Sequence, residues 1–281
     1  TPQILKESIV LSHYIEEELY EFIECYKNRD NLMEAGIEIT NSLLLYGPPG
    51  CGKTTVAQYI STATGLPLVT ARLDGLISGM LSKDVPIIIN RPFRAPHHTI
   101  SPKSLIGGGL IPKPGEVSLS HYGILFLDEF DVIAKLRDDK NELGELKRVV
   151  NSLIQNIDAL NNNSILIAAT NHHELLDPAI WRRFSTVVTL ERPNLEEIGQ
   201  LLQLYLKQYP GNILRKNKKI ILLEKAFDGF SHSDIKTTIS NSVKTAIIKG
   251  RKEITVCDIL KEIYFYKYHG VENEEEYIRF L

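Results

Sequence analysis

The sequence predicts an α/β fold: a parallel sheet of five strands with helices on both faces, followed by a small all-α domain. Five short apolar runs are separated by helical or loop stretches, as in sheets whose parallel strands are joined by crossover connections. A glycine-rich loop follows the first of these runs directly. After Pro193 the strand-like runs stop, and the remaining sequence has the spacing of helices.

The five apolar runs are the predicted strands. Each is short, and the first is stopped by Gly-Pro-Pro-Gly, a combination that ends a strand. Such runs are typical of strands that are buried on both faces of a parallel sheet. In chain order they are SLLLY at 42–46, LPLVTARL at 66–73, GILFLD at 123–128, SILIAAT at 164–170 and STVVTL at 185–190.

Apolar spacing and capping patterns predict the helices. Apolar side chains within 1–35 recur at helical spacing, and those within 141–160 form one stripe. Ser231 followed by Asp234 is a capping-box pattern, which predicts a helix that runs to Ile248. We expect three segments, namely an N-terminal helical segment or linker at 1–35, an α/β domain at 36–192 and a helical domain at 193–281.

Composition limits the classes of function. The 281 residues are 43% apolar and 24% charged, and the net charge of −3 does not suggest a surface built for nucleic acid. The three cysteines form no CxxC pair, so a reducing, cytoplasmic setting is expected. No apolar run approaches the roughly 18 residues of a membrane span, so no membrane partner is expected. The chain begins at Thr1, so we expect a fragment of a longer protein.

The glycine-rich loop GPPGCGKTT has the spacing of a phosphate-binding loop. Between a strand and a helix, such a loop directs successive backbone N–H groups at one spot, where the helix N-terminus adds partial positive charge. The lysine supplies a full charge for the β- and γ-phosphates, and the hydroxyl of Thr54 can ligate Mg²⁺. We expect Cys51 to be structural. The predicted residues for binding ATP with Mg²⁺ are Gly47, Pro48, Pro49, Gly50, Cys51, Gly52, Lys53, Thr54 and Thr55.

An acidic pair follows the third apolar run. Asp128 and Glu129 end a strand, so they are expected at the carboxyl edge of the sheet, where α/β proteins bind ligands. Asp128 is placed to hold Mg²⁺ through water, and Glu129 to orient or deprotonate the attacking water. Asp131 and Glu142 are expected to be surface charges.

Four motifs together resemble the AAA family of AAA+ ATPases: GPPGCGKT, LFLDEFD, AATN and LLDPAIWRRF, in this order. The resemblance implies a P-loop NTPase fold with the helical domain as a lid, and ATP hydrolysis in which Lys53 and Glu129 are catalytic. Asn171 is similar to the polar sensor beside the γ-phosphate. Arg182 and Arg183 are similar to the arginine fingers that reach the neighbouring subunit, and their adjacency resembles katanin- and spastin-like members.

The same resemblance implies a homo-oligomer, a ring of six subunits in the family. It favours a motor that remodels or unfolds a protein, and the expected partner besides the chain itself is a protein substrate or an adaptor. A nucleic-acid motor is the alternative, and a switch that binds ATP without hydrolysing it is a third. GFSHSDI at 229–235 resembles the GxSGADI segment of the lid, but His232 and Ser233 replace Gly-Ala and could alter the contact with adenosine.

An insertion at about 85–122 departs from the AAA pattern. RPFRAPHHT, LIGGG and PGEVSLSHYGILFLDE resemble the magnesium-chelatase-like subfamily, which includes competence-associated ATPases. Met80 and Leu81 stand where AAA members carry an aromatic pore loop. The glycines at 107–109 and five prolines exclude a continuous helix, so a loop or hairpin is expected. Two origins of the chain stay open: it is a natural protein of a separate lineage, or it is joined from the sequences of two parent proteins.

Overall fold

The computed structural model describes the residues 9–37, 39, 41–72, 107–108, 113–114, 122–131, 163–172, 174, 176, 178–207, 209, 213–214 and 217–267. The chain divides into two compact units. The first comprises Thr1–Leu5, His13–Gly47 and Lys53–Leu190, and the second comprises Lys6–Ser12, Pro48–Gly52 and Glu191–Leu281. The helix predicted at 141–160, Met80, Leu81 and Glu142 lie outside the described residues.

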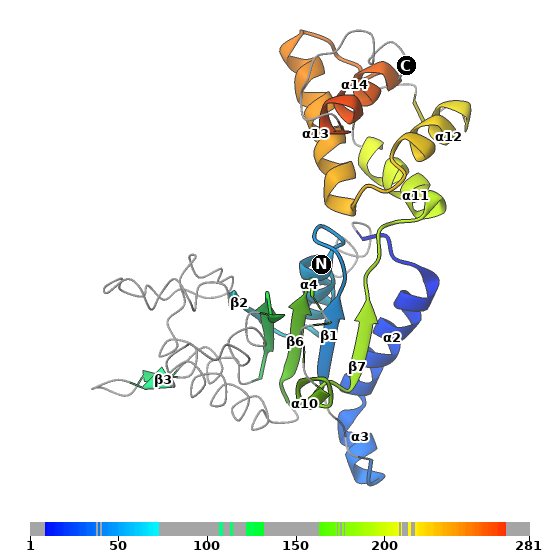
Figure 1. Ribbon diagram of the computed structural model, residues 1–281. Helices are drawn as coiled ribbons and strands as arrows, with labels where there is room; N and C mark the ends of the chain where they lie inside the picture. Colours follow the sequence, from blue (N-terminus) through cyan, green and yellow to red (C-terminus); the bar gives the residue numbers. More distant parts are fainter. Residues whose placement is uncertain are drawn as a thin grey trace. The chain divides into compact units, whose positions relative to one another are not determined.

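The first unit contains a five-stranded parallel sheet with the strand order β2-β5-β6-β1-β7 (Figure 1). Its interior strands are almost wholly buried, as their continuous apolar sequences require. This confirms the five predicted strands. Their bounds are β1 Ser42–Tyr46, β2 Leu68–Arg72, β5 Ile124–Asp128, β6 Ile165–Thr170 and β7 Thr186–Thr189.

The strand register brings the carboxyl ends of three neighbouring strands to one edge. Tyr46 of β1 lies beside Thr170 of β6, and Leu127 of β5 lies beside Ala168 of β6. The residues that follow β1, β5 and β6 therefore meet at this edge, where open α/β sheets bind their ligands.

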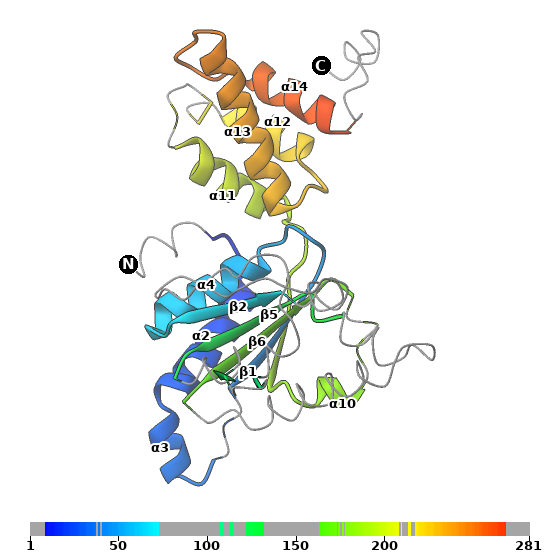
Figure 2. The ribbon, with the colours of Figure 1, turned by 90° about the vertical axis from the view of Figure 1, so that its left-hand side faces the viewer.

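Four described helices belong to the first unit: α2 His13–Lys27, α3 Arg29–Glu34, α4 Lys53–Thr64 and α10 Pro178–Trp181. Helix α2 packs against α4 and β7, while α4 packs against β2, β5 and β6. Figure 2 shows α2 and α4 on one side of the sheet and α10 on the other. The predicted apolar positions Leu19, Phe22 and Ile23 of α2 are buried.

After Pro193 the described part of the second unit is mainly helical. Helices α11 Leu195–Leu206, α12 Asn217–Ala226, α13 His232–Ile248 and α14 Val256–Lys267 surround one apolar core. The capping box predicted at Ser231 is present, since its hydroxyl accepts from the Asp234 N–H and the Asp234 carboxylate accepts from the Ser231 N–H. This fixes the first turn of α13.

Two residue pairs of the insertion are described. β3 (Gly107–Gly108) and β4 (Lys113–Pro114) pair antiparallel, with Gly107 beside Pro114 and Gly108 beside Lys113. An antiparallel pair this close in sequence is what a hairpin requires, as the glycines and prolines predict. Most of the insertion lies outside the described residues.

No helix among the described residues is both long and apolar enough to cross a bilayer.

Candidate nucleotide site

The loop between β1 and α4 depends on glycine. Gly47, Gly50 and Gly52 have φ angles of 147°, 77° and 90°, which only glycine adopts readily. A Cβ at position 47 would lie 2.0 Å from the carbonyl oxygen of Leu190, and a Cβ at position 50 would lie 2.5 Å from the Ser231 hydroxyl. Backbone conformation and space therefore both require glycine at these two positions.

Lys53, the first residue of α4, is buried and held by two acceptors. Its ammonium donates to the Gly47 carbonyl and to Oδ1 of Asn171, both at 2.7 Å. The residue is 8% exposed, and a buried ammonium needs such partners to offset its lost hydration. The structure thus brings the predicted phosphate-binding lysine and the predicted sensor into direct contact.

Asp128 and Glu129 lie at the carboxyl end of β5, both half-buried. The Glu129 N–H donates to Oδ1 of Asp128 at 3.0 Å, and the Phe130 N–H donates to the Ala169 carbonyl at 2.8 Å. Glu129 has a φ of 57°, in the left-handed region. This conformation costs a non-glycine residue roughly 1–2 kcal/mol. Tyr122, before β5, has a similar φ of 60°, so the predicted catalytic carboxylate is one of two described non-glycine positions with this strain.

Asp131 corrects one sequence expectation. It was expected to be a surface charge, but it is buried, and its carboxylate accepts from the Thr170 hydroxyl at 3.2 Å. The same hydroxyl accepts from the His172 N–H at 3.0 Å. Asp131 therefore links the turn after β5 to the end of β6. Sequence reasoning missed it because its partner lies 39 residues away.

The remaining loop residues differ in exposure. Thr54 is exposed and Thr55 is half-buried in the first turn of α4. Cys51 is 1% exposed, and its Sγ lies 4.0 Å from the Pro49 carbonyl oxygen, as expected of a structural side chain. Pro48 is half-buried and Pro49 is exposed.

The middle of the loop contacts the start of α13. The Ser233 N–H donates to the Gly50 carbonyl at 3.0 Å, so a backbone donor of the helix's first turn is satisfied by the loop. Burial lowers the pKa of His232, and a hydrogen bond to the Val10 backbone opposes this in part. Nδ1 of His232 is buried without a hydrogen-bond partner among the described residues. His232 is thus packed within the second unit.

Helix α10 lies near the end of β1 that is opposite to the phosphate loop, as Figure 1 shows, and the arginine pair directly follows this helix in the sequence. The Arg183 carbonyl accepts from the hydroxyl of Ser42, the first residue of β1, at 2.7 Å. The phosphate loop follows the last residue of this strand, so about 16 Å of strand lies between the two positions. Arg182 is exposed and Arg183 is half-buried. The backbone of the pair therefore lies a strand length from Lys53 of the same chain.

The donor set of the site suits a hard divalent cation. The Thr54 hydroxyl and the Asp128 carboxylate carry oxygen donors of the kind that Mg²⁺ prefers. Within the described ranges, no group of three or more His, Cys, Asp or Glu side chains is arranged to hold a metal ion.

Comparison with known proteins supports both resemblances. Over residues 23–176, more than half of the chain, the sequence matches the family of the magnesium chelatase subunit ChlI. The chain is 33% identical over 253 residues to the uncharacterized AAA family ATPase y4kL of Sinorhizobium fredii, which covers 90% of this chain and 68% of that protein.

Two further relatives match with lower identity. The ATP-dependent zinc metalloprotease FtsH of Thermus thermophilus is 26% identical over 92% of this chain, which spans 38% of that protein. The proteasome-activating nucleotidase of Saccharolobus solfataricus is 28% identical over 88% of this chain, which spans 58% of that protein. These matches and the five-stranded parallel sheet show that the chain belongs to the AAA family of ATPases.

Proposed function

We propose that this chain hydrolyses ATP with Mg²⁺ at the loop Gly47–Thr55. The observation that carries this proposal is the contact of Lys53 with Asn171 and with the Gly47 carbonyl, each at 2.7 Å. It places a cation and a polar amide together at the carboxyl edge of the sheet, next to the glycine-rich loop. If a γ-phosphate were bound here, its oxygens would replace the acceptors that now hold the Lys53 ammonium.

The residues at this edge of the sheet have different proposed roles in hydrolysis. Thr54 and Asp128 would hold Mg²⁺, which when bound neutralises charge on the β- and γ-phosphates. Glu129 would orient or deprotonate the attacking water, and Asn171 would position that water or the γ-phosphate. The left-handed backbone at Glu129 supports this role, because strained residues concentrate at functional sites.

The arginines would complete the site of a neighbouring subunit. Hydrolysis develops negative charge on the transferring phosphoryl group, and a guanidinium stabilises it. The Arg183 carbonyl is bonded to Ser42 at the far end of β1, so the pair is better placed to act on another chain than on its own loop. Arg182 and Arg183 are therefore proposed as fingers in trans, in the paired form of katanin- and spastin-like members.

The proposed assembly rests on the arginine pair, and the proposed substrate is supported by the names of the relatives. A finger in trans requires an oligomer, for which a hexameric ring is proposed. The names of FtsH and the proteasome-activating nucleotidase refer to proteolysis, which favours a motor that unfolds a protein substrate, delivered directly or by an adaptor. Residues 193–281 would act as the lid on the α/β domain at 36–192, with 1–35 as a linker. A cytoplasmic location is proposed with this function.

A nucleic-acid motor is the second candidate. The match to the magnesium chelatase subunit ChlI spans residues 23–176 and so includes the insertion, which resembles that of competence-associated ATPases.

The origin of the chain is a separate question. The relative from Sinorhizobium fredii matches 90% of the chain, which favours a natural lineage over a join of two parent sequences.

The first prediction concerns Glu129. Glu129→Gln keeps the shape of the side chain and removes the base, so ATP turnover should fall by about 10²–10⁴ while ATP binding persists. Turnover and the binding of a fluorescent ATP analogue are measured together. Lys53→Ala is the reference that loses binding, and Glu253→Gln, at an exposed glutamate, should behave as wild type. Unchanged turnover in Glu129→Gln would instead support a switch that does not hydrolyse ATP.

The second prediction concerns the fingers. Arg183→Ala should bind ATP but lose about 10³-fold or more of the turnover, because the transition-state cation is missing. When Arg183→Ala and Glu129→Gln chains are mixed, activity should reappear, since some interfaces then combine an intact Glu129 with an intact Arg183. A mixture as inactive as its components would argue against action in trans. Lys249→Ala, at an exposed lysine, controls for loss of charge.

The third prediction concerns which polymer, protein or DNA, stimulates ATP turnover. Casein, which has no stable fold, should raise ATP turnover, whereas single- or double-stranded DNA at equal mass should leave it unchanged. The rate is measured on the full chain, with Glu129→Gln as the background. Stimulation by DNA and not by casein would favour the nucleic-acid motor.

A further inference from the structure

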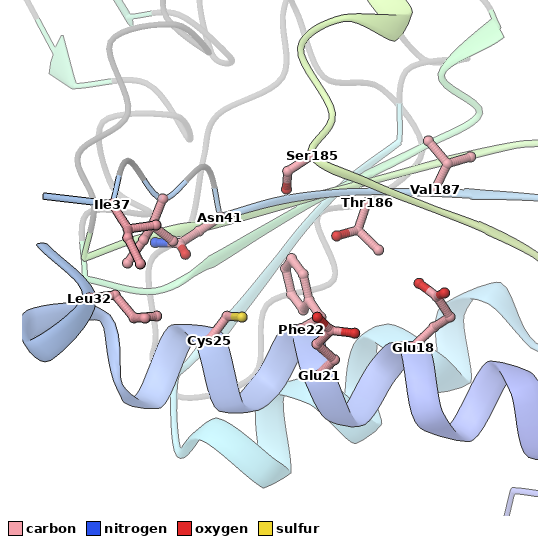
Figure 3. A pocket seen from close by; sticks show the side chains of 11 residues that line it. Glu18, Glu21, Phe22, Cys25, Leu32, Ile37, Asn41, Ser185, Thr186 and Val187 are labelled. Carbon is pink, nitrogen blue, oxygen red and sulfur yellow. The ribbon is translucent and has the colours of Figure 1, made fainter. Parts of the chain in front are cut away.

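A cavity of about 450 Å³ lies in the first unit between helix α2 and strand β7 (Figure 3). Its volume is within the roughly 300–1,000 Å³ of ligand-binding pockets. None of the loop, acidic-pair, sensor or arginine residues described above lines it. The lining residues are Glu18, Glu21, Phe22, Cys25, Leu32, Ile37, Ile39, Asn41, Ser185, Thr186 and Val187.

The cavity has an acidic part and an apolar part. Glu18 and Glu21 belong to α2, and Figure 3 shows the Glu18 side chain directed from the helix toward β7. Phe22 and Cys25 point from the same helix toward the sheet, and Thr186 points from β7 toward the helix. A ligand in this cavity would therefore meet carboxylates and apolar surface together.

The negative charge is not compensated by the lining, which contains no basic side chain. On α2, Glu17 pairs with His13 and Glu24 pairs with Lys27, both outside the lining. Glu21 has no ion-pair partner within the described part of the chain. The charge of the cavity is therefore complementary to a cationic group.

Exposed apolar side chains and an edge strand of the sheet lie next to the two glutamates of the cavity. Ile37 is 52% exposed and Val187 is 38% exposed, and both line the cavity. β7 is one of the two edge strands of the described sheet, and edge strands can pair with an added strand. An extended polypeptide beside β7 would cover Val187 and place alternate side chains into the cavity.

We propose that this cavity binds an extended segment of a partner protein in which a basic residue stands next to apolar ones. The basic side chain lies against Glu18 and Glu21, while an apolar neighbour packs on Phe22 and Ile37. The segment runs along β7. This site is separate from the proposed ATP chemistry, because it shares no residue with the phosphate loop or the acidic pair.

The test uses a short peptide of alternating lysine and valine as the probe, on the full chain. Cys25 and Cys257 are both exposed, so iodoacetamide alkylates both, and mass spectrometry gives the rate at each. Cys25 lines the cavity, while Cys257 lies on α14 and serves as the internal reference. The peptide should slow alkylation at Cys25 and leave Cys257 unchanged.

Charge is tested by matched variants on one helix. Glu21→Gln should weaken the peptide's affinity about two- to fivefold, as expected for an exposed ion pair, and Glu24→Gln should not change it. Glu21 is exposed, so its substitution leaves the core intact, and ATP turnover without peptide should equal that of wild type.

Three results would overturn the proposal. Equal protection of Cys25 and Cys257 would mean unspecific binding. Equal protection by a peptide of alternating glutamate and valine would mean that charge plays no part. Protection of Cys25 that rises with the concentration of the chain alone would assign the cavity to a second copy of this chain.

Discussion

The buried ammonium of Lys53 is the interaction on which the site depends. It joins the residue after β1 to the residue after β6, which lie 124 residues apart by number, through two bonds of 2.7 Å. Burying a charged group is costly unless it is hydrogen-bonded, and these two acceptors come together because β1 and β6 are parallel neighbours. The parallel pairing of β1 and β6 therefore determines both the order of the sheet and the position of the Lys53 ammonium.

Glycine at position 47 allows the loop after β1 to pass close to the chain that follows β7. A Cβ there would collide with the Leu190 carbonyl, which follows β7 on the other side of β1. The site is thus enclosed between the neighbours of β1, and the turn after β5 adds Asp128 and Glu129 from the next strand beyond β6. The arginine pair is attached to the opposite end of β1, through Ser42. This separation is the physical basis for proposing an active site divided between two chains.

Local features could be predicted from the sequence, and long-range ones could not. The first strand was predicted with its observed bounds and the others to within two residues, because continuous apolar runs and Gly-Pro stops are local signals. The capping box at Ser231 is local too. The burial of Asp131 depends on Thr170, and the contact of Ser233 with Gly50 joins residues 183 positions apart. Nothing in sequence spacing encodes these pairs, nor the cavity between α2 and β7.

The dependence of ATP turnover per chain on protein concentration tests the divided active site most directly. If the active site is divided between two chains, turnover should be low in dilute protein and rise as chains associate. It should reach a plateau once association, followed by light scattering in the same samples, is complete. Turnover per chain that stays constant from the monomer range upward would contradict the divided active site, because each chain would then hold a complete site.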